Sequence, residues 1–510
     1  MTAQGHSIRS ATERASVQRL EAVRSKVLPA RWFLFRRNLQ VTENRDFALD
    51  LLSRAARSGY NGMVLADYKL HILDHVTPEY FQHLDSVRSA AARLGIRIVP
   101  SVFCVGYSNG LLAHDPNLAE GVPISDAPCI VRGRRAAAER GAAIPLGANT
   151  EVVVQARRQY RLVAEVKAPA RLNVFGRDGR ILCSTRAVDG ERTGSKRCVA
   201  AFNSLDNDRV RITLFADGQD QVLSDEFVRG ELAHAGLLNI VRRNGAPLVV
   251  RSETGFIYEE GRDFEFLRDT MLGLIPWPGE YSVDHQSPVI ELTHHSRIRE
   301  GERLLVSAYH SLRIHDEQVV CCLSHPGVYE LMQDQLTRIC ELTDPEVLFL
   351  EIDEIRVANW CESCRRRELS PGQIVADATR RLIAMVRQKR PGTLVCTWSG
   401  MFDPHHLARD AYYAINGSLR DSWEGLDRDV LVCNWNRWQT RESTRWFVGR
   451  GHRQIFAGYY DEEPATYTRN LETAHKAAAL DGAMYTTWND DYSQLEAFAR
   501  HAWDGRSSLA

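Results

Sequence analysis

The sequence has no excess of charge of either sign, since 64 Lys and Arg stand against 65 Asp and Glu and leave a formal net charge of −1. Proteins that bind nucleic acid or anionic membrane surfaces usually carry a basic excess, so neither partner is predicted. No segment approaches the roughly 20 consecutive apolar residues that a membrane-spanning helix needs. Residues 1–26 lack the apolar core of a secretion signal, and we therefore expect a cytoplasmic protein.

Phosphate-binding glycine motifs are also missing. Neither GxGxxG nor GxxxxGK[ST] occurs, so the sequence gives no support for a dinucleotide or nucleoside triphosphate site, and no cofactor is expected. The 11 cysteines are an odd number in a chain of 510 residues, and their spacings are not those of a small disulfide-rich scaffold.

What the sequence does contain is an alternation of apolar strands and amphipathic helices at both ends of the chain. Three strands come first, at residues 31–39, 63–67 and 96–103. Five more follow residue 326, at 347–354, 393–398, 429–435, 453–461 and 482–490. Helical patterns such as 46–62, 78–95, 327–343 and 373–392 separate them. Eight strands alternating with helices predict a (β/α)₈ TIM barrel, with a doubly wound open sheet as the alternative.

Between the two halves the pattern changes to short alternating strands separated by Gly, Asp and Asn. This predicts a β-sandwich inserted after the third barrel strand. The expected organisation is an N-terminal helical extension over 1–30, the first part of the barrel over 31–125, the inserted sandwich over 126–324 and the second part of the barrel over 325–510.

In a TIM barrel the active site lies at the carboxyl ends of the strands, so the residues there are the candidate site. Acids, arginines and tryptophans dominate this set, which favours a carbohydrate site because indole faces pack against sugar rings while charged groups bind hydroxyls. The candidates, in chain order, are Arg36, Arg37, Asp67, Asp353, Glu354, Trp398, Asp403, Asn434, Trp435, Tyr459, Asp461, Trp488 and Asp490.

The order of these residues resembles that of the family-20 glycoside hydrolases, the β-N-acetylhexosaminidases. The acid pair Asp353–Glu354 follows strand four, Tyr459-Tyr460-Asp461 matches a Tyr-x-Asp motif, and Trp488-Asn489-Asp490 matches Trp-x-Glu with Asp in place of Glu. The chain departs from the family at residues 349–352, where Phe-Leu-Glu-Ile replaces His-x-Gly-Gly, and in its third strand.

The resemblance implies an exo-acting, retaining hydrolase of β-linked amino sugars that uses the substrate's own acetamido group. In this scheme Glu354 protonates the glycosidic oxygen, Asp353 orients the acetamido group and Tyr459 hydrogen-bonds its oxygen. The tryptophans form the walls of the pocket, and Arg36 or Arg37, with Asp461 and Asp490, binds hydroxyls. Two adjacent carboxylates resist ionising together, which raises the pKa of one of them.

Three other interpretations remain open. A β-galactosidase-like or other β-glycosidase could use two protein carboxylates, with Asp403, Asp461 or Asp490 as the second. A non-catalytic carbohydrate-binding protein could retain the barrel. The acid pair could instead form salt bridges with Arg356 and with residues 365–367. The expected partner is a small-molecule or oligosaccharide substrate, and the inserted module could bind carbohydrate, line the site or form a homodimer contact.

Cysteine pairs raise the question of a metal. Cys361 and Cys364 form a CxxC, and Cys321–Cys322 or His405–His406 could complete a zinc site. Zinc sites usually show two regular pairs with short spacers, so free thiols are favoured and no metal is predicted.

Overall fold

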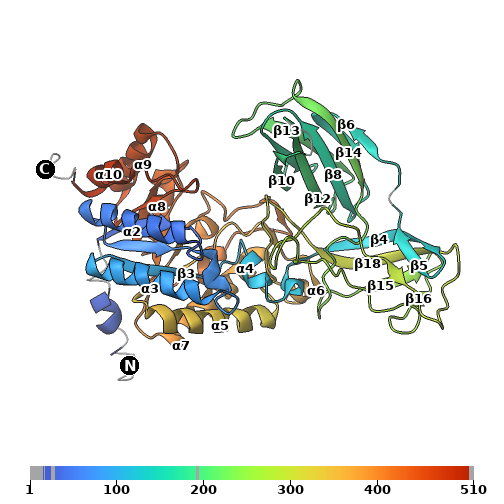
Figure 1. Cartoon of the computed structure of the whole chain (residues 1–510), viewed down its shortest axis with the longest axis horizontal. Coiled ribbons are helices and arrows are strands. Elements are labelled where there is room, and N and C mark those ends of the chain that lie inside the picture. The colour runs from blue at the N-terminus through green and yellow to red at the C-terminus, as the bar shows by residue number, and fades with distance from the viewer. Residues whose placement is uncertain (1–14, 16–17, 24–28, 140, 191–193, 505–510) are drawn as a thin grey trace, which may run out of the picture.

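The computed structural model describes residues 15, 18–23, 29–139, 141–190 and 194–504 (Figure 1). The predicted helical extension over residues 1–30 lies mostly outside this part of the chain, although residues 15 and 18–23 are helical.

Eight parallel strands close into a barrel in the order β1-β2-β3-β19-β21-β23-β24-β25. Closure comes from β1, in which Phe33 aligns with Met63 of β2 on one side and with Tyr485 of β25 on the other. The strands are β1 (Ala30–Phe35), β2 (Gly62–Leu65), β3 (Arg97–Val102), β19 (Val347–Leu350), β21 (Leu394–Trp398), β23 (Leu431–Asn434), β24 (Gln454–Tyr459) and β25 (Gly482–Thr486). The predicted TIM barrel is confirmed.

The barrel strands read as unbroken apolar runs because both of their faces are covered. Trp32, Phe33, Leu34 and Phe35 of β1 are all fully buried. The covering helices are α2 (Thr42–Arg57), α3 (Pro78–Arg93), α5 (Pro326–Thr343), α7 (Pro371–Lys389), α8 (Thr440–Gly449), α9 (Pro464–Ala477) and α10 (Leu495–Ala499), followed by a π-helical turn at Arg500–Asp504.

Local sequence signals set several of these helix ends. At the start of α7, the Ser370 hydroxyl accepts from the N–H of Gln373 at 3.2 Å, and the Gln373 side chain accepts from the N–H of Ser370 at 3.0 Å. Pro371 occupies the first turn, where its missing N–H is tolerated. Between β21 and β23 the chain forms only 3₁₀ turns (Gly400–Phe402 and Ser422–Gly425) and β22 (Ala414–Ile415), which pairs with β20 (Val357–Ala358).

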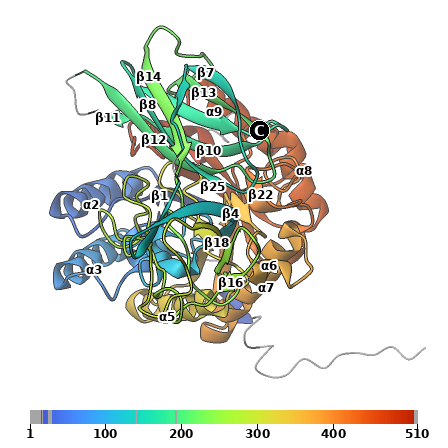
Figure 2. The same cartoon turned by 90° about the vertical axis from the view of Figure 1, so that its right-hand side faces the viewer.

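The insertion leaves the barrel after β3, through α4 (Asn109–Leu112) and a 3₁₀ turn at Pro116–Leu118, and contains three antiparallel sheets. A four-stranded sheet (β10-β9-β13-β7) and a five-stranded sheet (β11-β12-β8-β14-β6) lie against each other (Figure 2). Leu162 of β8 and Leu172 of β9 are fully buried. Their strands are β6 (Ile144–Leu146), β7 (Asn149–Val153), β8 (Gln159–Val166), β9 (Ala170–Phe175), β10 (Ile181–Arg186), β11 (Val188–Asp189), β12 (Lys196–Asn203), β13 (Arg209–Ala216) and β14 (Phe227–His234). The predicted inserted sandwich is therefore present.

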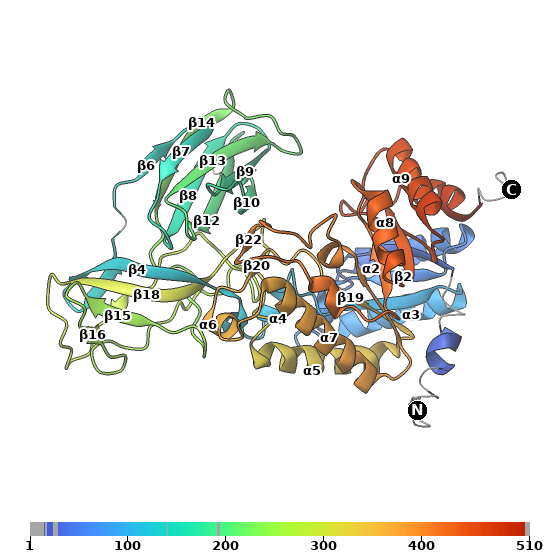
Figure 3. The same ribbon diagram turned by 180° about the vertical axis from the view of Figure 1, so that it is seen from behind.

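A third, six-stranded sheet (β16-β15-β18-β4-β5-β17) was not anticipated by the single-sandwich prediction. It pairs the first and last long strands of the insertion and lies beneath the sandwich (Figure 3). Its strands are β4 (Gly121–Arg132), β5 (Arg135–Ala138), β15 (Val249–Ser252), β16 (Ile257–Tyr258), β17 (Ile290–Glu291) and β18 (Arg303–Ser311). Among the described helices, none has the length and apolar character needed to cross a bilayer.

Candidate active site

Three carboxylates follow β19 at the carboxyl end of the barrel. Glu351 still pairs with β3, because its N–H donates to the carbonyl of Val102 at 2.9 Å. Glu351 and Asp353 are two residues apart, which is the spacing at which side chains of an extended segment lie on one side. β19 ends at Leu350, four residues before Glu354, which has a φ of 48°. Both Glu351 and Glu354 lie near enough to influence the ionisation of Asp353.

Asp353 is the most strongly perturbed of the three. Burial raises its pKa well above the usual range, and the neighbouring charge of Glu354 raises it further. Its Oδ1 is buried and has no hydrogen-bond partner within the described part of the chain. A Cβ placed on Gly400 would lie 2.5 Å from this oxygen, so the carboxyl group packs directly against the turn after β21. Burial and the neighbouring charges therefore favour the protonated form of Asp353.

Glu354 has the opposite environment, because a buried arginine pairs with it. Nη2 of Arg356 lies 2.6 Å from Oε1 of Glu354, and Arg356 is only 4% exposed. The hydroxyl of Tyr107 donates to Oε2 at 2.7 Å. Arg356 also donates to the Tyr107 oxygen at 3.0 Å and to Oε1 of Gln318 at 2.6 Å. Glu354 is thus one end of a charged, hydrogen-bonded network.

This network joins the barrel to the segment that returns from the insertion. The side-chain amide of Gln318 donates to the carbonyls of Gly106 and Glu354, both at 2.8 Å. The salt bridge to Arg356 was one of the alternatives raised by the sequence. Of residues 365–367, Arg366 and Arg367 pair with other acids, Glu362 and Asp377.

Glu351 is a functional candidate that the sequence reasoning missed. Burial raises its pKa to about 7, against a lowering influence from Cys104 and from the guanidinium of Arg36. The signal was present in the sequence, since Glu351 stands two residues before Asp353 and extended strands repeat every two residues.

Aromatic rings lie beside these acids. Trp435 stacks on Tyr460 with ring centroids 5.7 Å apart and an interplanar angle of 10°. Trp488 approaches Tyr460 at 6.3 Å and Trp398 at 6.1 Å. The Gly400 Cβ position that approaches Asp353 would also lie 3.1 Å from Cζ2 of Trp435, so acid and ring meet at the same turn. Trp488 is 41% exposed and Trp435 only 7%, so the wall runs from solvent into the interior.

The two candidate arginines after β1 diverge. Nη2 of Arg36 donates to the carbonyl of Trp488 at 2.8 Å, and its guanidinium lies 4.9 Å from the indole centroid. Arg37 instead lies 3.8 Å from the ring centroid of Phe47 in α2, with its Nε 3.8 Å from Oδ2 of Asp490. Of the two arginines, Arg36 is therefore the one that contacts the cluster of aromatic rings, through Trp488.

Two predicted binding acids are buried and bonded to the backbone. Asp67 accepts from the N–H groups of Leu39 and Lys69, both at 2.9 Å, and burial raises its pKa to about 6. Asp403 accepts from the N–H of His405 at 2.8 Å and from the Asn436 side chain at 2.9 Å. Burial raises the pKa of Asp403 as well. Both carboxyl groups are fully buried and order loops at the barrel mouth.

Two more candidates also have protein partners. Asn434 is 1% exposed, and its Oδ1 accepts from the hydroxyl of Ser443 and from the N–H of Asn436, both at 3.1 Å. Asp461 accepts from the hydroxyl of Thr487 at 2.5 Å and from the N–H of Trp488 at 2.7 Å. Asp461 therefore positions the exposed indole.

The Tyr459-Tyr460 pair separates into two different environments. Tyr459 stacks on Tyr485 at 4.6 Å, donates to Oδ2 of Asp491 at 2.5 Å and is 4% exposed. Tyr460, not Tyr459, meets Trp435. Residues 459–461 all have positive φ, so the strand alternation that would predict their directions is lost at this point.

Comparisons with known proteins find similarity in structure only. No protein-family description matches the chain, and neither does any curated protein. Similar solved structures include the chitobiase of Flavobacterium johnsoniae (10% identity, TM-score 0.42), the β-N-acetylhexosaminidase of Bacteroides fragilis (9%, 0.41) and the exo-β-N-acetylglucosaminidase of Vibrio harveyi (10%, 0.42). Each covers 93% of this chain. The chain spans 48%, 66% and 54% of their respective lengths, and its function is inferred below from its own site.

Proposed function

We propose that this protein is a glycoside hydrolase whose catalytic acid belongs to the cluster Glu351, Asp353 and Glu354. The observation that carries the proposal is the carboxyl group of Asp353, whose buried Oδ1 lies at the Gly400 turn beside the stacked rings of Trp435 and Tyr460 and whose pKa is raised by burial. A protonated acid next to an apolar ring surface is what cleavage of a glycosidic bond needs, because the ring holds the sugar and the acid protonates the leaving oxygen.

The contacts favour catalytic roles for Asp353 and Glu354 that differ from those implied by the motif order. Asp353 holds the proton and donates it to the glycosidic oxygen as the bond to the anomeric carbon breaks. Glu354, in its ion pair with Arg356, supplies the negative charge that faces the developing oxocarbenium ion. Water then attacks, and its proton returns to Asp353.

For the substrate, we propose an exo-acting, retaining reaction on a β-linked, N-acetylated amino sugar. The support is the order of the acid pair, Tyr-x-Asp and Trp-x-Asp along the strands. In this route the acetamido oxygen attacks the anomeric carbon and closes a ring on the substrate. Water then attacks the anomeric carbon and opens that ring. Tyr460 lies nearer the acids than Tyr459 and is the better candidate to contact the acetamido group, since its ionisation is influenced by both Asp353 and Glu354.

A β-glycosidase with two protein carboxylates is the second candidate, and Glu351 is the observation that favours it. The predicted second carboxylates Asp403 and Asp461 are both occupied by protein N–H and O–H donors. Glu351, with a pKa of about 7 beside Asp353, could serve in their place.

A panel of 4-methylumbelliferyl glycosides separates the two routes. If N-acetyl-β-glucosaminide or N-acetyl-β-galactosaminide is hydrolysed and a thiazoline analogue inhibits, the acetamido route holds. Hydrolysis of β-galactoside or β-glucoside without thiazoline inhibition supports the second route. If every glycoside binds and none is cleaved, the hydrolase proposal fails and a non-catalytic binding protein remains.

Variants then identify the acid. Asp353→Asn should lower kcat by roughly 10²–10⁴-fold on a disaccharide, but less on an aryl glycoside, whose leaving group needs little protonation. Glu354→Gln should lower kcat on the disaccharide and on the aryl glycoside by a similar factor. Glu346→Gln is the matched control, because Glu346 sits just before the start of β19 and pairs with Arg97. If Glu354→Gln shows the leaving-group dependence instead, the roles are reversed.

A further inference from the structure

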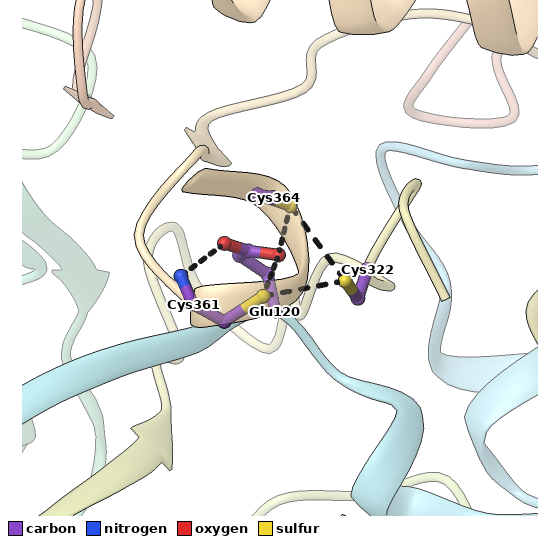
Figure 4. Close-up of side chains that lie close together, drawn as sticks. All are labelled: Glu120, Cys322, Cys361 and Cys364. Atoms are coloured by element: carbon purple, nitrogen blue, oxygen red, sulfur yellow. Dashed lines mark hydrogen bonds between the residues drawn. The ribbon is translucent and has the colours of Figure 1, made fainter. Parts of the chain in front are cut away.

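Four buried ligand-type side chains meet at one point outside the acid cluster. They are Glu120, Cys322, Cys361 and Cys364, whose ligand atoms all lie within 4.8 Å of one another (Figure 4). Glu120 immediately precedes β4 and Cys322 precedes α5, while Cys361 is the N-cap of α6 (Glu362–Arg365) and Cys364 lies within it. Three segments far apart in the sequence therefore supply the group: the entry to the insertion, its exit and the loop after β19.

The spacing of these atoms is that of a tetrahedral metal site. Sγ of Cys322 lies 3.5 Å from Sγ of Cys361 and 3.7 Å from Sγ of Cys364. Oε2 of Glu120 lies 3.6 Å and 3.3 Å from the same two sulfurs. Zinc bonds of about 2.3 Å to sulfur and about 2.0–2.2 Å to oxygen place tetrahedral ligands roughly 3.5–3.8 Å apart.

The carboxylate of Glu120 is oriented towards the thiols by the backbone. Its Oε1 accepts from the N–H groups of Trp360 at 2.8 Å and Cys361 at 3.0 Å, which leaves Oε2 facing the sulfurs. The residue is only 3% exposed. A buried carboxylate surrounded by thiols is unfavourable unless a cation pairs with it. Arg243 lies close enough to interact with Glu120 and Cys361, and it would offset part of the remaining negative charge of a metal-bound cluster.

A disulfide does not explain the arrangement. The observed sulfur separations exceed the S–S bond length of about 2.05 Å, and three thiols with one carboxylate cannot all be paired by one bond. The zinc site that the sequence suggests as an alternative combines Cys361 and Cys364 with Cys321–Cys322 or with two histidines. It does not include Glu120, which lies 241 positions before Cys361.

We propose that Glu120, Cys322, Cys361 and Cys364 bind one structural zinc ion. Four protein ligands complete the tetrahedron and leave no open position, which is typical of structural and not of catalytic zinc. The ion would tie both ends of the insertion to the loop that follows Asp353 and Glu354. This proposal is independent of the proposed hydrolase activity, because it concerns metal content and stability.

The test is the metal content of the full-length protein, purified in reducing buffer without chelator and measured by inductively coupled plasma mass spectrometry. We expect about one zinc ion per chain in the wild type. Cys322→Ser and Cys361→Ser should lose it, and Glu120→Gln should weaken zinc binding on the order of tenfold or more. Cys340→Ala, a buried thiol in α5 outside the cluster, should keep the full content.

Two measurements on the wild type remain informative if a variant fails to fold. Exchange with Co²⁺ should give the visible absorption of tetrahedral thiolate ligation, and mercurial modification of the thiols should release the zinc. The proposal is overturned if the purified protein lacks zinc and gives no cobalt–thiolate absorption. Mass spectrometric detection of a disulfide between any two of the three cysteines would also overturn it.

Discussion

The ion pair between Glu354 and Arg356 should be strongly coupled, and a double-mutant cycle measures that coupling without any substrate. The perturbations are Arg356→Met, Glu354→Gln and the two together. Two unit charges about 4 Å apart interact by about 4 kcal/mol at an effective dielectric constant of about 20. The Glu354 side chain is 25% exposed, so solvent screening reduces the expected coupling to about 2 kcal/mol.

Arg356→Met alone should destabilise the barrel by about 3 kcal/mol, because it leaves Glu354 without its cation and removes the donor to Gln318. Glu354→Gln should destabilise it less, since it leaves no unpaired buried carboxylate and its amide oxygen can still accept the hydrogen bond from Arg356. The double variant should be about 2 kcal/mol more stable than the sum of the single effects predicts.

The assay is urea unfolding at pH 7 followed by tryptophan fluorescence. Nine of the ten tryptophans lie outside the insertion and only Trp277 lies within it, so the signal reports on the barrel. The matched control is Arg338→Met with Asp334→Asn in α5, a pair with the same 2.6 Å contact whose side chains are 44% and 54% exposed. Its coupling should stay below about 1 kcal/mol. Additive effects of the Glu354 and Arg356 substitutions would refute the buried ion pair.

Three further outcomes are expected. Glu351 has a folded-state pKa of about 7 against an ordinary value of 4.5, so the folded protein binds a proton that the unfolded chain releases. Its contribution to stability therefore falls as pH rises from about 4.5 to 7, and Glu351→Gln should flatten the decline in urea midpoints measured across that range. Gly400→Ala should place a Cβ 2.5 Å from Oδ1 of Asp353. The overpacking should destabilise the fold by about 1–3 kcal/mol, which lowers the melting temperature, and should reduce kcat/KM. If neither the melting temperature nor kcat/KM changes, the turn at Gly400 accommodates the methyl group and the expected packing against Asp353 is wrong. Ser370→Ala removes the capping box of α7 and should lower the free energy of unfolding by about 1 kcal/mol in the same urea assay, while Ser370→Asp, which keeps a cap acceptor, should not.

The amino-acid sequence was sufficient to predict the barrel and the position of its mouth. Unbroken apolar runs such as that of β1 arise because both faces of a parallel strand are covered, and amphipathic helices between them leave few other folds. The same logic placed Asp353 and Glu354 at the end of a strand. These patterns depend only on residues that are close together in the sequence.

The environment of each side chain could not be read in this way, because it depends on partners distant in sequence. Asp67 and Glu354 are both acids at strand ends. Asp67 accepts from the backbone N–H of Lys69 in its own loop and from that of Leu39 in the loop after β1, whereas Glu354 meets Tyr107 from the β3 loop and Arg356 held by Gln318. Burial raises the pKa of Asp353, and burial exists only once the barrel and the turn at Gly400 are assembled.

The cluster around Glu120 shows most clearly the difference between local sequence patterns and tertiary contacts. The position of a CxxC shortly after the acid pair is a local property of the amino-acid sequence. Cys322 and Glu120 join the CxxC only in the folded protein, because the insertion between them folds with its two ends paired as β4 and β18. Antiparallel pairing of those strands brings the entry and exit of the insertion together beside the loop after β19, and no local pattern encodes that meeting.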